Sequence, residues 1–410
     1  DERGILPLDT PINAYWPDAH WPDTMNPADY TLRDLLTHQV PFDNGAITFL
    51  EAYVMRVDPA LYPVLITEMS EPREPGFRYD NLGYNVYAAI LETATGRSWQ
   101  DWLDEVIFDP LGMDRTSART SDFSLDELAW SHMWQGEDDG WFEVRPKTDG
   151  MMQSAGGLVT SPNDMITWLQ LQLRGEAPEA GLTATMLDTA NTSFVETGMG
   201  NQNPYEMVCD GYALGWSICE YGGYTVHIHG GGYTGARTIM AWLPEEGVGI
   251  AAFSNSDNMT GWWTQTAVRM FLQFLADHPE ADQWAERRLE FYGEQTASLL
   301  DGRRQSETEA LANEVWGGWD WHPGDAELAE YTGTYIHPAL GIETEFVRSG
   351  EGLEFRFGDL RSNLRPARRD LFGGTNTPFE DPDVFQFARD DAGNLTGFTW
   401  NGQDFTRTGN

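Results

Sequence analysis

Four short segments of the chain carry residue types that could act together in acyl transfer. They are residues 32–38, 75–84, 154–164 and 227–235. In the second segment, Tyr79 stands in a loop directly before a helical pattern, so its phenol can face a cleft while the helix anchors it. A neighbouring cation would lower the pKa of this phenol and let it shuttle a proton. Asn81 can orient a substrate amide through its side-chain hydrogen bonds.

The fourth segment contains a histidine followed by three glycines on a predicted strand. Gly230 and Gly231 let the strand backbone approach a substrate closely. The backbone N–H of Gly232 is the expected oxyanion-hole donor. His229 lies directly before them, and we expect it to assist the proton transfer.

Taken singly, these residues also have structural interpretations. Tyr79 and Asn81 are individually more typical of a turn and a helix cap, and His229 of a satisfied strand histidine. His38 and His227 we interpret as structural. The pair His227 and His229 could suggest a metal site, but no third ligand is in evidence, so we expect no metal and no other cofactor. The order of the four segments is what favours a catalytic site.

Helix and hairpin signals surround these segments in the first 280 residues. Capping boxes begin helices at Thr31, Ser98 and Ser161. Residues 82–95 have apolar positions at helical spacing, and Gly96 stops them. Two hairpins follow, residues 212–220 with 224–229 and residues 238–243 with 248–253, and then a helix over 262–276. This is an α+β pattern, an antiparallel sheet flanked by helices.

The remaining chain changes character. Residues 282–315 are charged and helical, and from Leu328 onward short alternating segments predict strands. These predicted strands are residues 331–335, 343–348, 353–357, 383–388, 395–400 and 405–407. Their spacing predicts a small closed antiparallel β-barrel. We therefore expect a catalytic domain over 1–281, a helical connector over 282–324 and a barrel over 325–410.

In their order and separations, the four segments resemble the serine hydrolases of the penicillin-binding protein and class C β-lactamase type. The stretch 107–113 is also typical of that family, and the resemblance covers residues 1 to about 280. It implies a β-lactamase/transpeptidase-like domain in which Tyr79 and Asn81 match the Tyr-x-Asn element. His229, Gly230 and Gly231 take the place of the Lys-Thr-Gly element. The part from about 325 resembles the lipocalin-like barrel appended to some peptidases of this family.

One element of that family is missing. Its Ser-x-x-Lys pair needs a serine three residues before a lysine, but the only lysine is Lys147 and position 144 is Val144. Residues 5–12 look like the family segment that follows the nucleophile helix. We therefore expect the nucleophile to lie on a missing N-terminal segment or on a separate N-terminal chain that carries Ser and Lys.

The resemblance implies an acyl-enzyme mechanism on amide or ester bonds, including those of small peptides. Histidine in place of the family's lysine, and the appended barrel, favour a peptidase or esterase over a β-lactamase. A different class of function remains open: a non-catalytic protein that binds a peptide, glycan or small ligand in the cleft or the barrel.

The composition limits the partners and the compartment. A formal net charge of −40, from 25 basic and 65 acidic residues, disfavours nucleic acid and anionic membranes as partners. Adaptation to high salt and an Arg-for-Lys codon bias explain this acidity equally well. No apolar run predicts membrane insertion. Cys209 and Cys219 lie in adjoining extended segments, so a disulfide and two partly buried thiols are both open. We expect a secreted or periplasmic protein.

Overall fold

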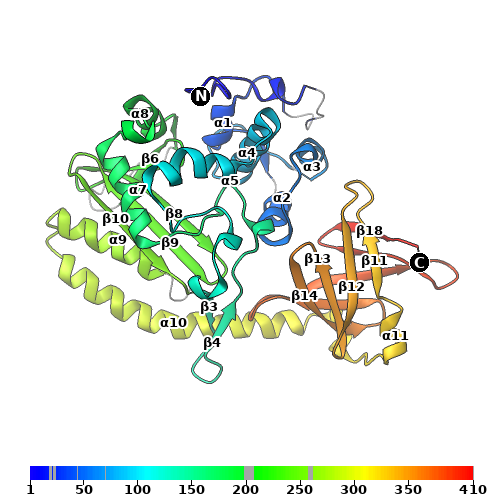
Figure 1. Cartoon of the computed structure of the whole chain (residues 1–410). Coiled ribbons are helices and arrows are strands. Elements are labelled where there is room, and N and C mark those ends of the chain that lie inside the picture. Colours follow the sequence, from blue (N-terminus) through cyan, green and yellow to red (C-terminus); the bar gives the residue numbers. More distant parts are fainter. Residues whose placement is uncertain are drawn as a thin grey trace. The chain divides into compact units, whose positions relative to one another are not determined.

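The computed structural model describes residues 1–17, 21, 25–43, 45–69, 71–197, 207–256 and 262–409, without the side chains of residues 43, 71, 72 and 262. These residues form two compact units (Figure 1). The first unit contains residues 1–52, 56–132 and 143–293, and the second contains residues 53–55, 133–142 and those from 294 onward. The domain limits at 281–282 and 324–325 stay a prediction.

A six-stranded antiparallel sheet organises the first unit. Its strand order is β10-β9-β8-β7-β6-β5. The strands are β5 (Val195–Glu196), β6 (Val208–Tyr212), β7 (Ser217–Tyr221), β8 (Tyr224–Tyr233), β9 (Ala236–Leu243) and β10 (Val248–Ser254). Both predicted hairpins are present, with turns at 222–223 and 244–247. Smaller two-stranded sheets pair β1 (Phe42–Asp43) with β2 (Glu71–Pro72) and β3 (Ser131–Trp134) with β4 (Trp141–Val144).

Helices cover both faces of the large sheet. Successive strand residues point to opposite faces, and β9 shows this directly. Its Ile239 and Ala241 belong to the core that contains Val268 of α9 (Trp262–Leu275). Its Trp242 instead packs with Leu169 of α7 (Pro162–Arg174). The sheet is therefore buried on both sides, which explains the near-continuous apolar character of β9.

The predicted helix starts are confirmed. Thr31 forms a capping box with Asp34 at the start of α1, and Ser98 and Ser161 accept hydrogen bonds from the backbone at the starts of α5 and α7. Gly96, in a left-handed conformation at φ 67°, ends α4. The α-helices of the first unit other than α7 and α9 are α1 (Leu32–Leu36), α2 (Gly45–Phe49), α3 (Tyr62–Met69), α4 (Leu82–Thr95), α5 (Trp99–Leu103), α6 (Asp109–Leu111) and α8 (Ala184–Asn191).

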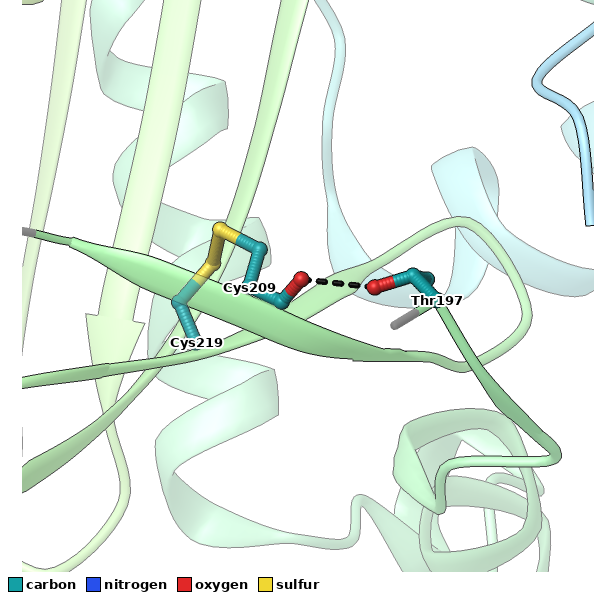
Figure 2. Close-up of a disulfide and its surroundings, with 3 residues drawn as sticks. All are labelled: Thr197, Cys209 and Cys219. Carbon is teal, nitrogen blue, oxygen red and sulfur yellow. Dashed lines mark hydrogen bonds between the residues drawn. A yellow bond between two sulfur atoms is a disulfide. The ribbon is translucent and has the colours of Figure 1, made fainter. Parts of the chain in front are cut away.

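Cys209 of β6 and Cys219 of β7 form a disulfide between paired strands (Figure 2). The structure thus selects the disulfide over the two free thiols. The hydroxyl of Thr197 donates a hydrogen bond of 2.6 Å to the carbonyl oxygen of Cys209. The strand pair, the disulfide and this hydrogen bond together tie Thr197 to β6 and β7.

Removing this disulfide is expected to lower the free energy of unfolding by about 3 kcal/mol, because the bond closes a short loop and restricts the unfolded chain. The measurement is urea unfolding of a Cys209→Ala/Cys219→Ala double variant beside the oxidised wild type. Wild type with reductant should fall to the same midpoint as the variant. Equal midpoints for oxidised wild type and variant would show that the bond adds no stability.

The second unit contains a closed antiparallel barrel, as the sequence predicts, but it has eight strands rather than the six predicted. The strands are β11 (Gly333–Ile336), β12 (Glu343–Ser349), β13 (Gly352–Phe357), β14 (Leu360–Arg368), β15 (Leu371–Thr375), β16 (Asp383–Arg389), β17 (Leu395–Trp400) and β18 (Gln403–Arg407). α10 (Ala281–Leu311), predicted as a charged helix, and the short α11 (Asp325–Ala329) precede them. Within the described residues, no helix is long and apolar enough to cross a membrane.

Aromatic rings fill the barrel interior. The buried rings come from Tyr335, Phe346, Phe355, Phe385, Phe387, Phe398, Trp400 and Phe405. Phe346 contacts Phe398 edge to face with centroids 4.8 Å apart, an arrangement that favours both rings. An eight-stranded barrel is wide enough to be filled by its own side chains or to hold one small ligand. The buried rings listed above form a packed core inside this barrel.

Candidate functional site

The loop before α4 brings Tyr79 to β8. The Tyr79 Oη lies 3.5 Å from the Nε2 of His229, and Tyr79 is 51% exposed. The two residues are 150 positions apart in the chain. The structure therefore brings together the predicted phenol and the predicted strand histidine.

Asn81 stands at the N-cap position directly before α4, but its side chain does not cap the helix. Its backbone is helical at φ −67°, ψ −26°, and its side chain makes no capping hydrogen bond. The Asp80 carboxylate accepts from the N–H of Leu82 in its place. Asn81 is therefore the N-cap residue by position only, and it lines the cavity.

His38 positions the Tyr79 loop. It stands in the left-handed region at φ 57°, where its Nδ1 lies 3.1 Å from the backbone N and 2.9 Å from the backbone O of Asp80. Its Nε2 lies 3.0 Å from the Tyr212 hydroxyl, and its ring lies 4.4 Å from that of Tyr79. Burial lowers the pKa of His38 to about 4, so the ring is neutral near pH 7. The structural interpretation of His38 is confirmed.

The Ser154 loop is held by a buried amide on α4. The Asn85 Oδ1 accepts from the Ser154 hydroxyl at 3.0 Å and from the N–H of Ala155 at 3.1 Å. The Asn85 Nδ2 donates to the Gln153 Oε1 at 2.8 Å and also to the carboxylate of Glu51. The Ser154 hydroxyl is thus committed to structure, while its neighbours Gln153 and Ala155 line the cavity.

Glu51 lies below this loop as a buried carboxyl group. Only 7% of the residue is exposed, and it accepts hydrogen bonds from the Tyr62 hydroxyl and from Asn85. Burial raises its pKa to about 7, against the opposing effect of the two hydrogen bonds. Glu51 is therefore expected to be largely protonated at mildly acidic pH.

The Glu51→Gln substitution should change how stability depends on pH. The folded-state pKa of about 7 lies above the ordinary value of 4.5, so the folded protein binds more protons than the unfolded chain between these values. The stabilisation is complete below pH 4.5 and is lost as pH rises toward 7, by about 3 kcal/mol. Urea unfolding from pH 4 to 8 should show the variant gaining stability relative to wild type over that range. The exposed α3 carboxylate variant Glu68→Gln is the control, and parallel curves for Glu51→Gln and wild type would contradict the assignment.

The predicted site residues line one cavity of about 610 Å³. Tyr79, Asn81, His229 and the three glycines that follow it all contribute to its wall. The first segment enters only indirectly, through His38. The third segment contributes Gln153, Ala155 and Gly156. The second, third and fourth segments therefore meet at this cavity, and the first segment supports it through His38.

The electrostatic environment of the phenol differs from the expectation. Partial burial, and next the Asp80 carboxylate, raise the pKa of Tyr79 above its ordinary value. Burial lowers the pKa of His229, so the neighbouring ring is a neutral partner. The expected lowering of the Tyr79 pKa depends on a neighbouring cation, and no described cation is among the causes of its shift, so that expectation stays a prediction.

The glycines of β8 face crowded cross-strand positions. A Cβ at Gly231 would lie 2.5 Å from the Thr238 hydroxyl, and one at Gly232 would lie 2.3 Å from the Nη1 of Arg237. Gly230 has no such close neighbour. At Gly231 and Gly232 the glycine is therefore explained by β9 as well as by the approach of a substrate.

His227 is separate from the site. It is buried, stacks on Trp242 with centroids 4.1 Å apart, and its Nε2 lies 3.1 Å from the backbone oxygen of Asn191. Its predicted structural role is confirmed. Among the described residues, no group of three or more His, Cys, Asp or Glu side chains could hold a metal ion.

Sequence reasoning missed Lys147 as a cavity residue. Its side chain lines the same cavity, with the Nζ 4.3 Å from the ring centroid of Tyr233. One feature of the sequence could have indicated this: Lys147 lies seven residues before Ser154, close to the third segment. Burial lowers the pKa of Lys147 to about 8.

A helix-flanked antiparallel sheet with a Tyr, Asn, His and glycine-lined cavity beside it defines a β-lactamase/transpeptidase-like hydrolase domain. Residues 1–272 match the model of the Beta-lactamase family. The chain belongs to this family. A solved octameric penicillin-binding protein homologue from Pyrococcus abyssi has the same fold, with a TM-score of 0.56 and 18% identity over 99% of this chain and 84% of that chain.

Two curated relatives carry the names of hydrolytic enzymes. Unguisins hydrolase ungD' of Aspergillus campestris is 25% identical over 80% of this chain and 61% of its own length. The D-alanyl-D-alanine-carboxypeptidase/endopeptidase AmpH of Escherichia coli K12 is 24% identical over 60% of this chain and 64% of its own length. The chain thus spans about 60% of the length of these relatives.

Proposed function

We propose that this chain forms most of a serine hydrolase that cleaves amide or ester bonds through an acyl-enzyme. A peptidase or esterase is favoured over a β-lactamase, because His229 stands where the family's lysine would bind a substrate carboxylate. The observation that carries the proposal is the approach of Tyr79 to His229 in a cavity that also contains Asn81 and Gly232.

The serine and lysine would come from a segment outside these 410 residues, either upstream in the same polypeptide or on a separate chain. The reason is that no serine precedes Lys147 by three residues. In the reaction, the serine oxygen bonds to the substrate carbonyl carbon while the lysine accepts its proton. Tyr79, assisted by His229, passes a proton to the leaving nitrogen or oxygen as that bond breaks. Water then cleaves the acyl-enzyme.

The remaining cavity residues orient and stabilise. The Asn81 amide would hold the substrate's amide group. The N–H of Gly232, with that of the nucleophile, would donate to the oxyanion. We assign no metal or organic cofactor to this scheme. The disulfide supports a secreted or periplasmic location, because such bonds persist in oxidising compartments.

The test has two parts. The residues encoded before Asp1, and any second polypeptide in the native preparation, are read for Ser-x-x-Lys. The native preparation is then treated with a fluorophosphonate probe, and intact mass locates the adduct. We expect the adduct on that serine. An upstream sequence and a preparation that both lack the motif would overturn the catalytic proposal.

The absence of a nucleophile–lysine pair from these 410 residues favours one second candidate, a protein that binds a peptide or glycan in the same cavity without cleaving it. Saturable binding of a peptide with no acylation, in a native preparation shown to lack Ser-x-x-Lys, would support this candidate instead.

A further inference from the structure

The only lysine of the chain lies where a substrate would bind. Lys147 is partly buried in the cavity wall, beside Tyr233, which ends β8 directly after Gly232. Its ammonium is therefore close to the strand that carries the proposed oxyanion donor. This position is independent of the Tyr-x-Asn and His-Gly-Gly elements used above.

Lys147 has no anionic partner among the described residues. Apart from the contact with the Tyr233 ring, it makes no hydrogen bond or ion pair there. This is unexpected in a chain with 65 acidic residues. A partly buried ammonium without a partner is costly, and the loss of water lowers its pKa to about 8. A bound anion would remove that cost.

The cavity wall as a whole has the opposite charge balance to the chain. None of its described lining residues is Asp or Glu, whereas Lys147, His229 and Arg269 are basic. Arg269, on α9, is exposed and likewise makes no ion pair with a described residue. Since the whole chain has a formal net charge of −40, this described wall without carboxylates is a local exception that would select anionic ligands.

We propose that Lys147 is the specificity residue that anchors a carboxylate of the substrate in this cavity, with Arg269 adding positive charge. His229 stands where the family resemblance would place a lysine. Because His229 is neutral, it does not supply the positive charge that would bind a substrate carboxylate. We take a carboxylate rather than a phosphate as the occupant, since the partly buried Lys147 offers a single point charge and Arg269 is exposed, whereas phosphate sites use arginine forks or a helix N-terminus at the ligand. That the bound carboxylate belongs to a substrate rests on the proposed hydrolase function. The existence of an anion site at Lys147 does not depend on that function.

The single lysine gives a direct test. Chain labelled with [¹⁵Nζ]-lysine should show one side-chain ammonium signal. N-acetylated dialanine in its D and L forms, each as free carboxylate and as carboxamide, is titrated against this signal. We expect a carboxylate to shift the signal and raise the Lys147 pKa, and to bind at least tenfold more tightly than its carboxamide. Calorimetric titration measures the same preference in the variants, which carry no lysine signal: Lys147→Met should lose it, whereas Lys147→Arg should retain part of it.

Three outcomes with the dipeptides would overturn the proposal. They are equal binding of carboxylate and carboxamide, a preference that survives in a folded Lys147→Met variant, and no binding of either form. Inorganic phosphate is titrated in the same way as the dipeptides. A shift of the Lys147 signal by phosphate as strong as that by the dipeptide carboxylate would indicate a general anion site and would also overturn the assignment. None of these measurements needs a nucleophile, so they separate failure of this proposal from failure of the hydrolase proposal.

Discussion

Replacement of Tyr79 by phenylalanine is expected to slow acylation by about 10²–10⁴-fold, the usual contribution of a positioned proton-transfer group. The phenol oxygen lies 3.5 Å from the Nε2 of His229 in the cavity. Its raised pKa keeps it protonated at rest, so it must exchange its proton with the nucleophile pair during the reaction. The measurement is the single-turnover acylation rate of the enzyme that contains its Ser-x-x-Lys segment.

The matched control is Tyr224→Phe. Tyr224 lies on the same strand as His229, its hydroxyl donates to the backbone oxygen of Leu275, and it does not line the cavity. Its loss should leave the acylation rate unchanged. Since phenylalanine keeps the ring that packs on His38, a Tyr79→Phe enzyme as fast as wild type would exclude the phenol from proton transfer.

A methyl group added at Gly83 is expected to destabilise the first unit by about 3 kcal/mol or more, near the upper end of overpacking costs. A Cβ at this position of α4 would lie 2.2 Å from the carbonyl oxygen of Leu35 on α1. The contact is with backbone and not with a flexible side chain, so it can be relieved only if α1 or α4 shifts as a whole. Because α4 directly follows Asn81, a shift of about 1 Å would also misplace the Tyr79 loop, at a cost of about 10²-fold in rate.

Gly302→Ala is the control for this substitution. Gly302 lies inside α10, and nothing lies within 4 Å of its Cβ position. Alanine should therefore stabilise that helix by about 0.5–1 kcal/mol. Urea unfolding and acylation rates of both variants give the comparison. A Gly83→Ala protein as stable as wild type would mean that α1 and α4 do not approach this closely.

Much of the fold was readable from local rules. The three capping residues, the Gly96 stop and both hairpin turns act within a few residues of chain, and they agree with the structure. The barrel strands β14 and β15 were missed for reasons that lie outside their own sequence. β15 has no alternation because its Gly373 is buried against the Trp319 ring, which lies 2.5 Å from its Cβ position. β14 places Ser362 inward and includes Pro366, so it resembles a polar loop.

The candidate site was predictable where a motif carried it. Tyr79, Asn81 and the His229 strand were found because their order matches a family pattern, and the cavity unites them. Asn85 and Glu51 could not be found this way, since their roles depend on a hydrogen-bond network between residues up to 69 positions apart. Lys147 was set aside because its spacing fits no motif, and only the folded chain shows what it faces.

The solitary lysine also decides how this protein can be handled. Lys147 is the only lysine in these 410 residues and therefore their one side-chain target for amine-directed reagents. A lowered pKa leaves more of the Lys147 amine uncharged, and therefore nucleophilic, at mild pH. Succinimidyl dyes and aldehyde resins would consequently attach inside the cavity and occlude it. Immobilisation through the abundant surface carboxylates would keep the cavity open.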